Sequence, residues 1–111
     1  NIKIYAVEPD TSAVLSGEPS GPHKLQGIGA GFIPETLDTK IIDKILKISA
    51  KDAYEAGKAL PREEGFLVGI SAGAALAAAT QLAKLPENKG KNIVVLLPDS
   101  GDRYLSSEMF A

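Results

Sequence analysis

A serine between two glycines is the part of this sequence whose residue types and spacing could do chemistry. The segment GISAG (residues 69–73) follows the apolar run FLVGI and leads into an alanine-rich stretch, which predicts a strand followed at once by a helix. The Ser71 hydroxyl would then lie beside the free amides of a helix N-terminus. Ligands of open α/β sheets bind at such carboxyl ends of strands. Ser71 is therefore a candidate binding residue.

Three interpretations of Ser71 compete. It is a helix N-cap, or the nucleophile of a G-x-S-x-G hydrolase elbow, or a residue that holds an aromatic or anionic cofactor. The hydrolase elbow needs its acid and then its histidine downstream of the serine, but the only histidine here, His23, lies upstream. That triad cannot be completed, so the cap and the cofactor-binding residue remain open alternatives.

Two other segments accompany this motif. HKLQGIGAGFIP (residues 23–34) has three alternating glycines, but Phe32 stands where a G-x-G-x-x-G dinucleotide fingerprint needs its last glycine. VVLLPDSGDRYLSS (residues 94–107) follows an apolar run with the sequence Asp-Ser-Gly-Asp, which is typical of a turn. We interpret Asp99 and Asp102 as turn and ion-pair residues.

Together these three segments resemble the C-terminal part of the cysteine synthases, also called O-acetylserine sulfhydrylases. The resemblance covers essentially all of residues 1–111, from VEP near the start to RYLSSEMF at the end. Cystathionine β-synthases share the serine-glycine turn but match GIGAGFIP less well. The resemblance implies pyridoxal 5'-phosphate as cofactor, the tryptophan-synthase-β type of fold, and O-acetylserine and sulfide as substrates. It also implies a homodimer.

The resemblance assigns roles to individual residues. Cofactor-binding residues are expected to be Ser71, whose hydroxyl would bond the pyridine nitrogen, together with Gly73 and Pro98. Gln26, Gly27 and Ile28 are expected to line the substrate-binding mouth, with no room for a side chain at position 27. His23 and Lys24 are either a solvated basic pair or part of a rim that docks the C-terminal tail of serine acetyltransferase.

The family's Schiff-base lysine, asparagine loop and phosphate-holding glycine-threonine loop have no counterpart in this sequence. We therefore expect the chain to be a fragment, the C-terminal part of a catalytic domain, which is inactive alone. The alternatives are a cystathionine β-synthase-like enzyme and a non-catalytic module of the same fold that binds a peptide or an anion.

Apolar runs alternate with helical patterns along the chain, which predicts an α/β fold with a mostly parallel sheet and helices on both faces, part of a three-layer architecture. Strands are expected at 2–7, 45–48, 66–70 and 92–97. A helix should begin after Ser49, with Asp52 completing a capping-box pattern, and Pro61 should kink or end it. A second helix is expected over 72–85.

Composition narrows the function classes. The 111 residues carry a formal net charge of -2, which gives no basic field to hold a nucleic acid. The absence of cysteine and the single histidine argue against disulfides and a transition-metal site. No apolar run approaches the roughly 18 residues that a membrane span needs. We expect a soluble, cytoplasmic protein.

Overall fold

A computed structural model describes residues 1–111 and contains a parallel pair of strands. Strand β1 (Tyr5–Pro9) pairs with β2 (Lys44–Ile48), in a register that joins Tyr5 to Lys44 and Pro9 to Ile48. Between them runs a long connection with two short 3-10 turns, η1 (Val14–Ser16) and η2 (Thr39–Ile41). The predicted α/β class and parallel pairing are confirmed, although β1 begins later than the sequence indicated.

Helix α1 (Ala50–Glu64) begins as predicted and ends later. The Ser49 hydroxyl accepts a hydrogen bond from the Asp52 amide at 3.1 Å, which caps the first turn. Of the two effects expected of Pro61, a kink or an end of the helix, the end is wrong, since the helix continues to Glu64. A proline removes one amide donor from the helix. The helix ends where Gly65 adopts a left-handed conformation (φ 78°) and its amide donates to the Pro61 carbonyl.

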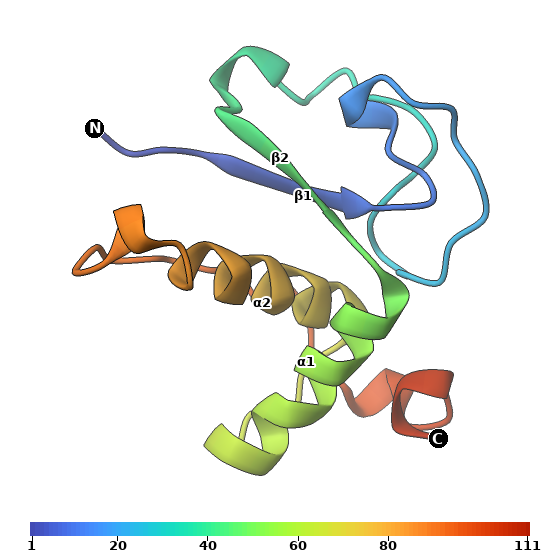
Figure 1. Ribbon diagram of the computed structural model, residues 1–111. Helices are drawn as coiled ribbons and strands as arrows, with labels where there is room; N and C mark the ends of the chain where they lie inside the picture. Colours follow the sequence, from blue (N-terminus) through green and yellow to red (C-terminus); the bar gives the residue numbers. More distant parts are fainter.

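Helix α2 (Ile70–Ala83) lies between the strands and α1 (Figure 1). Because it has neighbours on both sides, small residues dominate its buried positions, which are Ile70, Ser71, Ala72, Gly73, Ala74, Ala77, Ala78 and Leu82. Its N-cap is Gly69, with no side-chain capping bond. The interpretation of Ser71 as the N-cap is therefore wrong, because Ser71 lies inside the first turn.

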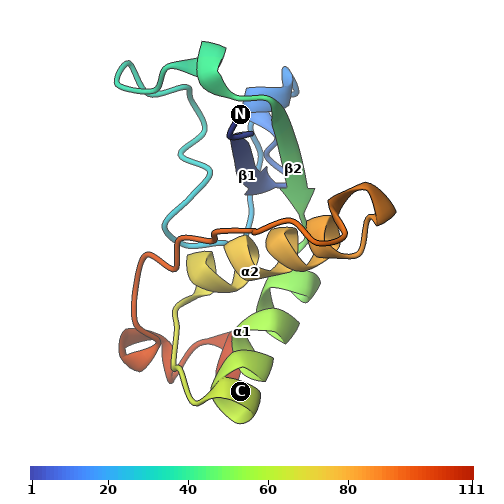
Figure 2. The same ribbon diagram turned by 90° about the vertical axis from the view of Figure 1, so that its left-hand side faces the viewer.

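The strands predicted over 66–70 and 92–97 do not form. Val68 and Ser100 make a single antiparallel bridge, while the segment before Pro98 is extended without a strand partner. The side chains of Val94 and Leu96 are 95% and 79% exposed, so an apolar run that reads as a buried strand has no neighbour in this chain. Both helices lie on the same side of the strand pair (Figures 1 and 2).

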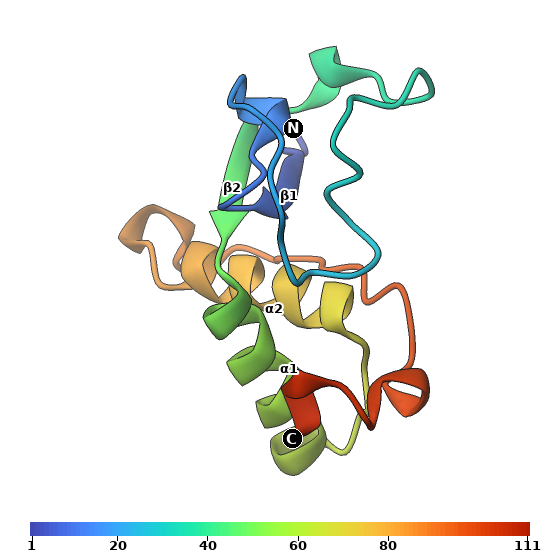
Figure 3. The same cartoon turned by 90° about the vertical axis from the view of Figure 1, so that its right-hand side faces the viewer.

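One core joins these elements. It consists of Leu25, Ile48, Ala53, Ile70, Ala74, Ala77, Ala78 and Met109. Leu25 anchors the glycine-rich segment, residues 23–34. Three short 3-10 turns complete the chain, η3 (Pro86–Asn88), η4 (Asp102–Tyr104) and η5 (Glu108–Phe110), and Met109 anchors the last of them. The long connection thereby reaches the start of α2 (Figure 3). None of the helices has the length and apolar character that crossing a membrane requires.

Candidate functional site

Ser71 and Asp99 form the polar centre of the candidate site. The Ser71 hydroxyl donates a hydrogen bond to Asp99 Oδ1 at 3.4 Å, and the Ser71 residue is only 6% exposed. Ser71 comes from the first turn of α2, whereas Asp99 comes from the turn that follows the extended segment 91–98. Residues 28 positions apart in the sequence therefore meet at one helix end.

The backbone holds Asp99 against the start of α2. The Gly69 amide donates to the Asp99 carbonyl at 3.1 Å, and the Gly101 amide donates to the Leu67 carbonyl at 3.2 Å. A side chain at Gly69 would overlap the Asp99 carboxylate. The carboxylate thus occupies the space that glycine leaves beside the helix N-terminus.

Tyr104 contributes a second hydroxyl near the same carboxylate. Hydrogen bonding to Asp99 is the main reason why the pKa of Tyr104 is raised above its ordinary value, and desolvation adds to the shift. A nearby carboxylate disfavours a second negative charge. Asp99 therefore belongs to the candidate site, although its sequence context predicted only a role in a turn or an ion pair. The sequence signal for it was its place directly after the apolar run 93–98.

Gly27 brings bare backbone against Ser71. Its φ of +99° lies in the left-handed region, which favours glycine. A β-carbon added there would come 3.3 Å from Ser71 Oγ and 3.4 Å from Ser71 Cβ. The structure thus joins two predicted site residues, one assigned to the substrate and one to the cofactor.

His23 and Lys24 both make contacts within the chain. His23 Nδ1 accepts from the Leu25 amide at 3.1 Å, so Nε2 carries the proton and donates to the Gly29 carbonyl at 2.7 Å. Lys24 pairs with Glu108 at 3.0 Å, and hydrogen bonding to Glu108, followed by its charge, raises the pKa of Lys24. The ammonium group remains exposed, so the predicted docking role stays a prediction.

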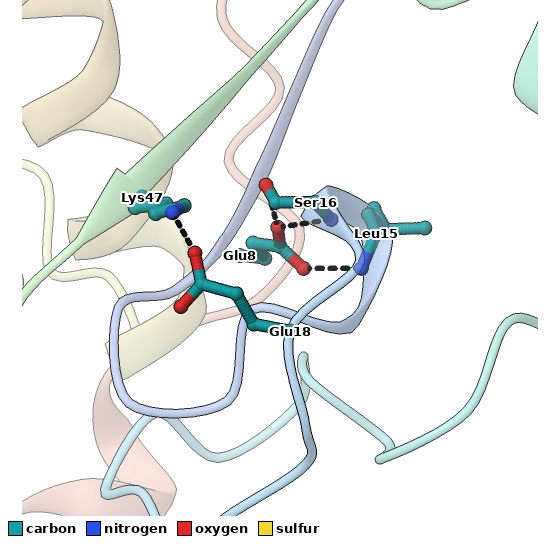
Figure 4. Close-up of polar contacts among 5 residues, drawn as sticks. All are labelled: Glu8, Leu15, Ser16, Glu18 and Lys47. Atoms are coloured by element: carbon teal, nitrogen blue, oxygen red, sulfur yellow. Dashed lines mark hydrogen bonds and ion pairs between the residues drawn. The ribbon is translucent and has the colours of Figure 1, made fainter.

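A pocket of about 480 Å³ lies between β1 with η1 and the glycine-rich segment. Gly27 and Ile28 are among its lining residues, while Ser71 is not. Glu8 forms part of its wall, and the Glu8 carboxylate accepts bonds from the Leu15 amide, the Ser16 amide and the Ser16 hydroxyl (Figure 4). These bonds fix the wall of the pocket.

The other predicted residues lie around this centre. Gln26 is exposed, and Pro98 is exposed directly before Asp99. Gly73 faces α1, where an added β-carbon would come 3.2 Å from the Gly57 α-carbon. Its small size therefore serves helix packing, and its assignment to the cofactor stays a prediction.

Comparison with known proteins decides the family. The sequence model for the family described as "Pyridoxal-phosphate dependent enzyme" matches residues 1–99. The chain belongs to the pyridoxal-phosphate-dependent enzymes. The likeness to cysteine synthases that the motifs predicted is also confirmed, because the chain is 53% identical over all 111 residues to the cysteine synthase of Staphylococcus aureus (strain Mu50). It covers 36% of that protein.

Solved structures agree. A cysteine synthase from Entamoeba histolytica superposes with a TM-score of 0.96 at 46% identity, over 99% of this chain and 32% of that one. An O-acetylserine-dependent cystathionine β-synthase from Helicobacter pylori gives 0.82 at 39% identity, over 99% and 35% of the two chains. The chain thus spans about a third of the length of these relatives.

The site fits one edge of the family's cofactor. Pyridoxal phosphate has a pyridine nitrogen as the polar atom of its ring, and Ser71 offers a neutral hydroxyl at a helix end without a side-chain cap. Gly27 brings backbone without a side chain to the same point. Ser71 and the first turn of α2 could therefore hold the ring edge of the cofactor.

Proposed function

We propose that this chain is the C-terminal part of a pyridoxal-phosphate-dependent cysteine synthase, which replaces the acetoxy group of O-acetylserine with sulfide. The contact between Gly27 and Ser71 carries the proposal, because it joins the expected substrate mouth and the expected cofactor edge within one chain. The identity of 53% to a cysteine synthase over every residue supports the choice of reaction.

Each side of this contact has a distinct task. Ser71 binds the ring edge of the cofactor through a neutral hydroxyl, while Gln26, Gly27 and Ile28 line the approach of the amino-acid substrate. When bound, pyridoxal phosphate supplies the electron sink for loss of the acetoxy group. The covalent lysine and the phosphate-binding loop belong to the remainder of the polypeptide. The isolated chain is accordingly inactive.

The partners are proposed from the resemblance of the sequence motifs to the cysteine synthases. The complete protein is a homodimer in the cytoplasm, and His23 with Lys24 forms part of the rim that docks the acidic tail of serine acetyltransferase. A docking carboxylate would compete with Glu108 for the exposed Lys24 ammonium group. Lys24→Ala should therefore weaken docking, whereas Glu108→Gln should strengthen it.

The second candidate is a cystathionine β-synthase-like reaction, in which a larger thiol replaces the acetoxy group. The Helicobacter pylori structure favours it, because that O-acetylserine-dependent enzyme superposes on 99% of this chain. Competition between sulfide and homocysteine for O-acetylserine, measured by product analysis, separates the two reactions. A preference for homocysteine would support the second candidate.

The proposal is tested on the complete polypeptide with Ser71→Ala and a matched control, Ser100→Ala. Ser100 is exposed on the turn that carries Asp99, so loss of its hydroxyl should leave cofactor binding and cysteine formation within about twofold of wild type. Ser71→Ala should weaken cofactor binding about fivefold, the effect of one lost hydrogen bond. Wild-type protein that binds no pyridoxal phosphate would favour the non-catalytic binding module instead.

A further inference from the structure

The Ser71 hydroxyl can donate only one hydrogen bond, and in this structure its acceptor is Asp99. A carboxylate can only accept, so in the 3.4 Å contact with Asp99 Oδ1 the serine is the donor. The Ser71 oxygen then presents its lone pairs to any other partner. A ligand at this helix end either donates to Ser71 or competes with Asp99 for the proton.

Asp99 is held independently of Ser71. Its carbonyl accepts from the Gly69 amide, and the bridge between Val68 and Ser100 fixes the neighbouring backbone. Its carboxylate lies where a side chain at Gly69 would have to go. A group so fixed can orient a hydroxyl, because it does not have to be ordered when a ligand arrives.

We propose that Asp99 is a positioning residue for Ser71: its carboxylate fixes the direction of the Ser71 hydroxyl and competes with the bound ring for the Ser71 proton. This inference rests on the proposed function, since it takes the ring nitrogen of pyridoxal phosphate as the ligand of Ser71. It adds a residue that touches neither substrate nor cofactor and acts through a hydrogen bond.

The raised pKa of Tyr104 supports the same geometry. The carboxylate that accepts from Ser71 of α2 is also the main cause of the raised pKa of Tyr104 in η4. Arg103 is the cationic group that lowers the pKa of Tyr104, opposing the effect of Asp99. Removal of the Asp99 carboxylate should therefore free the Ser71 hydroxyl and lower the pKa of Tyr104, whereas removal of Tyr104 should leave the Ser71 contact in place.

A double-mutant cycle on the complete protein tests the inference. Asp99→Ala and Ser71→Ala are made singly and together, and the apoproteins are titrated with pyridoxal phosphate while absorbance and fluorescence are recorded. Ser71→Ala should weaken binding about fivefold, whereas Asp99→Ala, which removes the competitor for the Ser71 proton, should strengthen it by up to about fivefold. If Asp99 acts through Ser71, the double variant should match Ser71→Ala within about twofold. Additive effects of the two changes would overturn the inference.

Two further variants separate positioning from a general effect on folding. Asp102→Ala removes an exposed carboxylate three positions along the same turn and should leave binding and the absorption maximum unchanged. Asp99→Asn keeps an oxygen acceptor without the charge and should fall between wild type and Asp99→Ala. If Asp99→Ala does not fold, the cycle is run with Asp99→Asn. It should then show coupling of about twofold, and its absence would overturn the inference.

The cycle is repeated on the cofactor-free proteins by urea unfolding. The contact exists without a ligand, so the two single changes should again be non-additive in the unfolding midpoint. Wild type that fails to bind pyridoxal phosphate but retains this coupling would defeat the proposed function and keep the Asp99–Ser71 pairing. Binding without any coupling would defeat the inference and leave the proposed function standing.

Discussion

Gly57 of α1 packs directly against Gly73 of α2. A β-carbon at Gly73 would come 3.2 Å from both the amide nitrogen and the α-carbon of Gly57, and would overlap the Ala53 carbonyl oxygen. Backbones can approach this closely only where neither residue has a side chain. The contact lies one turn or less from Ser71, so it fixes the height of the candidate site above α1.

Gly73→Ala should therefore destabilise the complete protein by about 1–3 kcal/mol, the usual cost of overpacking, although alanine is the better helix former. Urea unfolding measures the loss. Gly65→Ala is the matched control. Nothing lies within 4 Å of the position that a β-carbon would take there, so the alanine would be strained only by the left-handed φ of 78°. A smaller loss at Gly73 than at Gly65 would contradict the close helix contact.

Glu8→Gln should cost about 2 kcal/mol in the free energy of unfolding. Glu8 is only 3% exposed, and its carboxylate accepts from two amides and one hydroxyl in η1 (Figure 4). Hydrogen bonds to a buried charge are the strong ones, and a glutamine would turn its amide NH2 group, itself a donor, toward one of those donors. The wall of the 480 Å³ pocket should loosen with it.

The control for Glu8 is Glu18→Gln. Glu18 pairs with Lys47, but both side chains are nearly half exposed, and such surface pairs contribute at most about 1 kcal/mol (Figure 4). Chemical denaturation of both variants gives the comparison. Equal losses would show that burial and the three donors add nothing at Glu8.

Met109→Ala should destabilise the protein by about 2–4 kcal/mol, because Met109 is fully buried in the core beside Gly57. The loss should also free η5, and with it the Glu108 partner of Lys24. Limited proteolysis of the C-terminal segment reports this release. Leu105→Ala, at a side chain 59% exposed, should change the free energy by less than about 0.5 kcal/mol. Unchanged proteolysis of Met109→Ala would count against the anchoring role.

Stability should fall at alkaline pH, in part through Tyr104. The folded-state pKa of Tyr104 is raised, so the contribution is fully present below the unfolded value of about 10 and is lost as pH rises through the folded pKa. Tyr104→Phe should therefore lose less stability than wild type as the pH rises above about 10. Ultraviolet titration of tyrosinate should show that Tyr104 ionises at a lower pH in Asp99→Asn than in wild type. An unchanged titration there would contradict the contact with Asp99.

Local patterns in the sequence determined the parts of the fold that depend on neighbours along the chain. The cap at Ser49 and the strand before it follow from hydrogen bonds and side-chain alternation within a few residues. The segment around Gly27 was recognisable as a close approach of backbone, because glycine clusters where side chains do not fit. Family resemblance then paired that segment with Ser71.

Only the tertiary structure decided what those segments meet. The run from Ile93 to Leu96 has the composition of a buried strand, but a strand needs a hydrogen-bonding neighbour, and this chain places none beside it. The sequence correctly predicted a turn at Asp99 but not the contact of Asp99 with Ser71, since residues so far apart leave no local periodicity to detect. The sequence determines which residues can turn, cap and pack, while long-range contacts decide which polar groups form hydrogen bonds with one another.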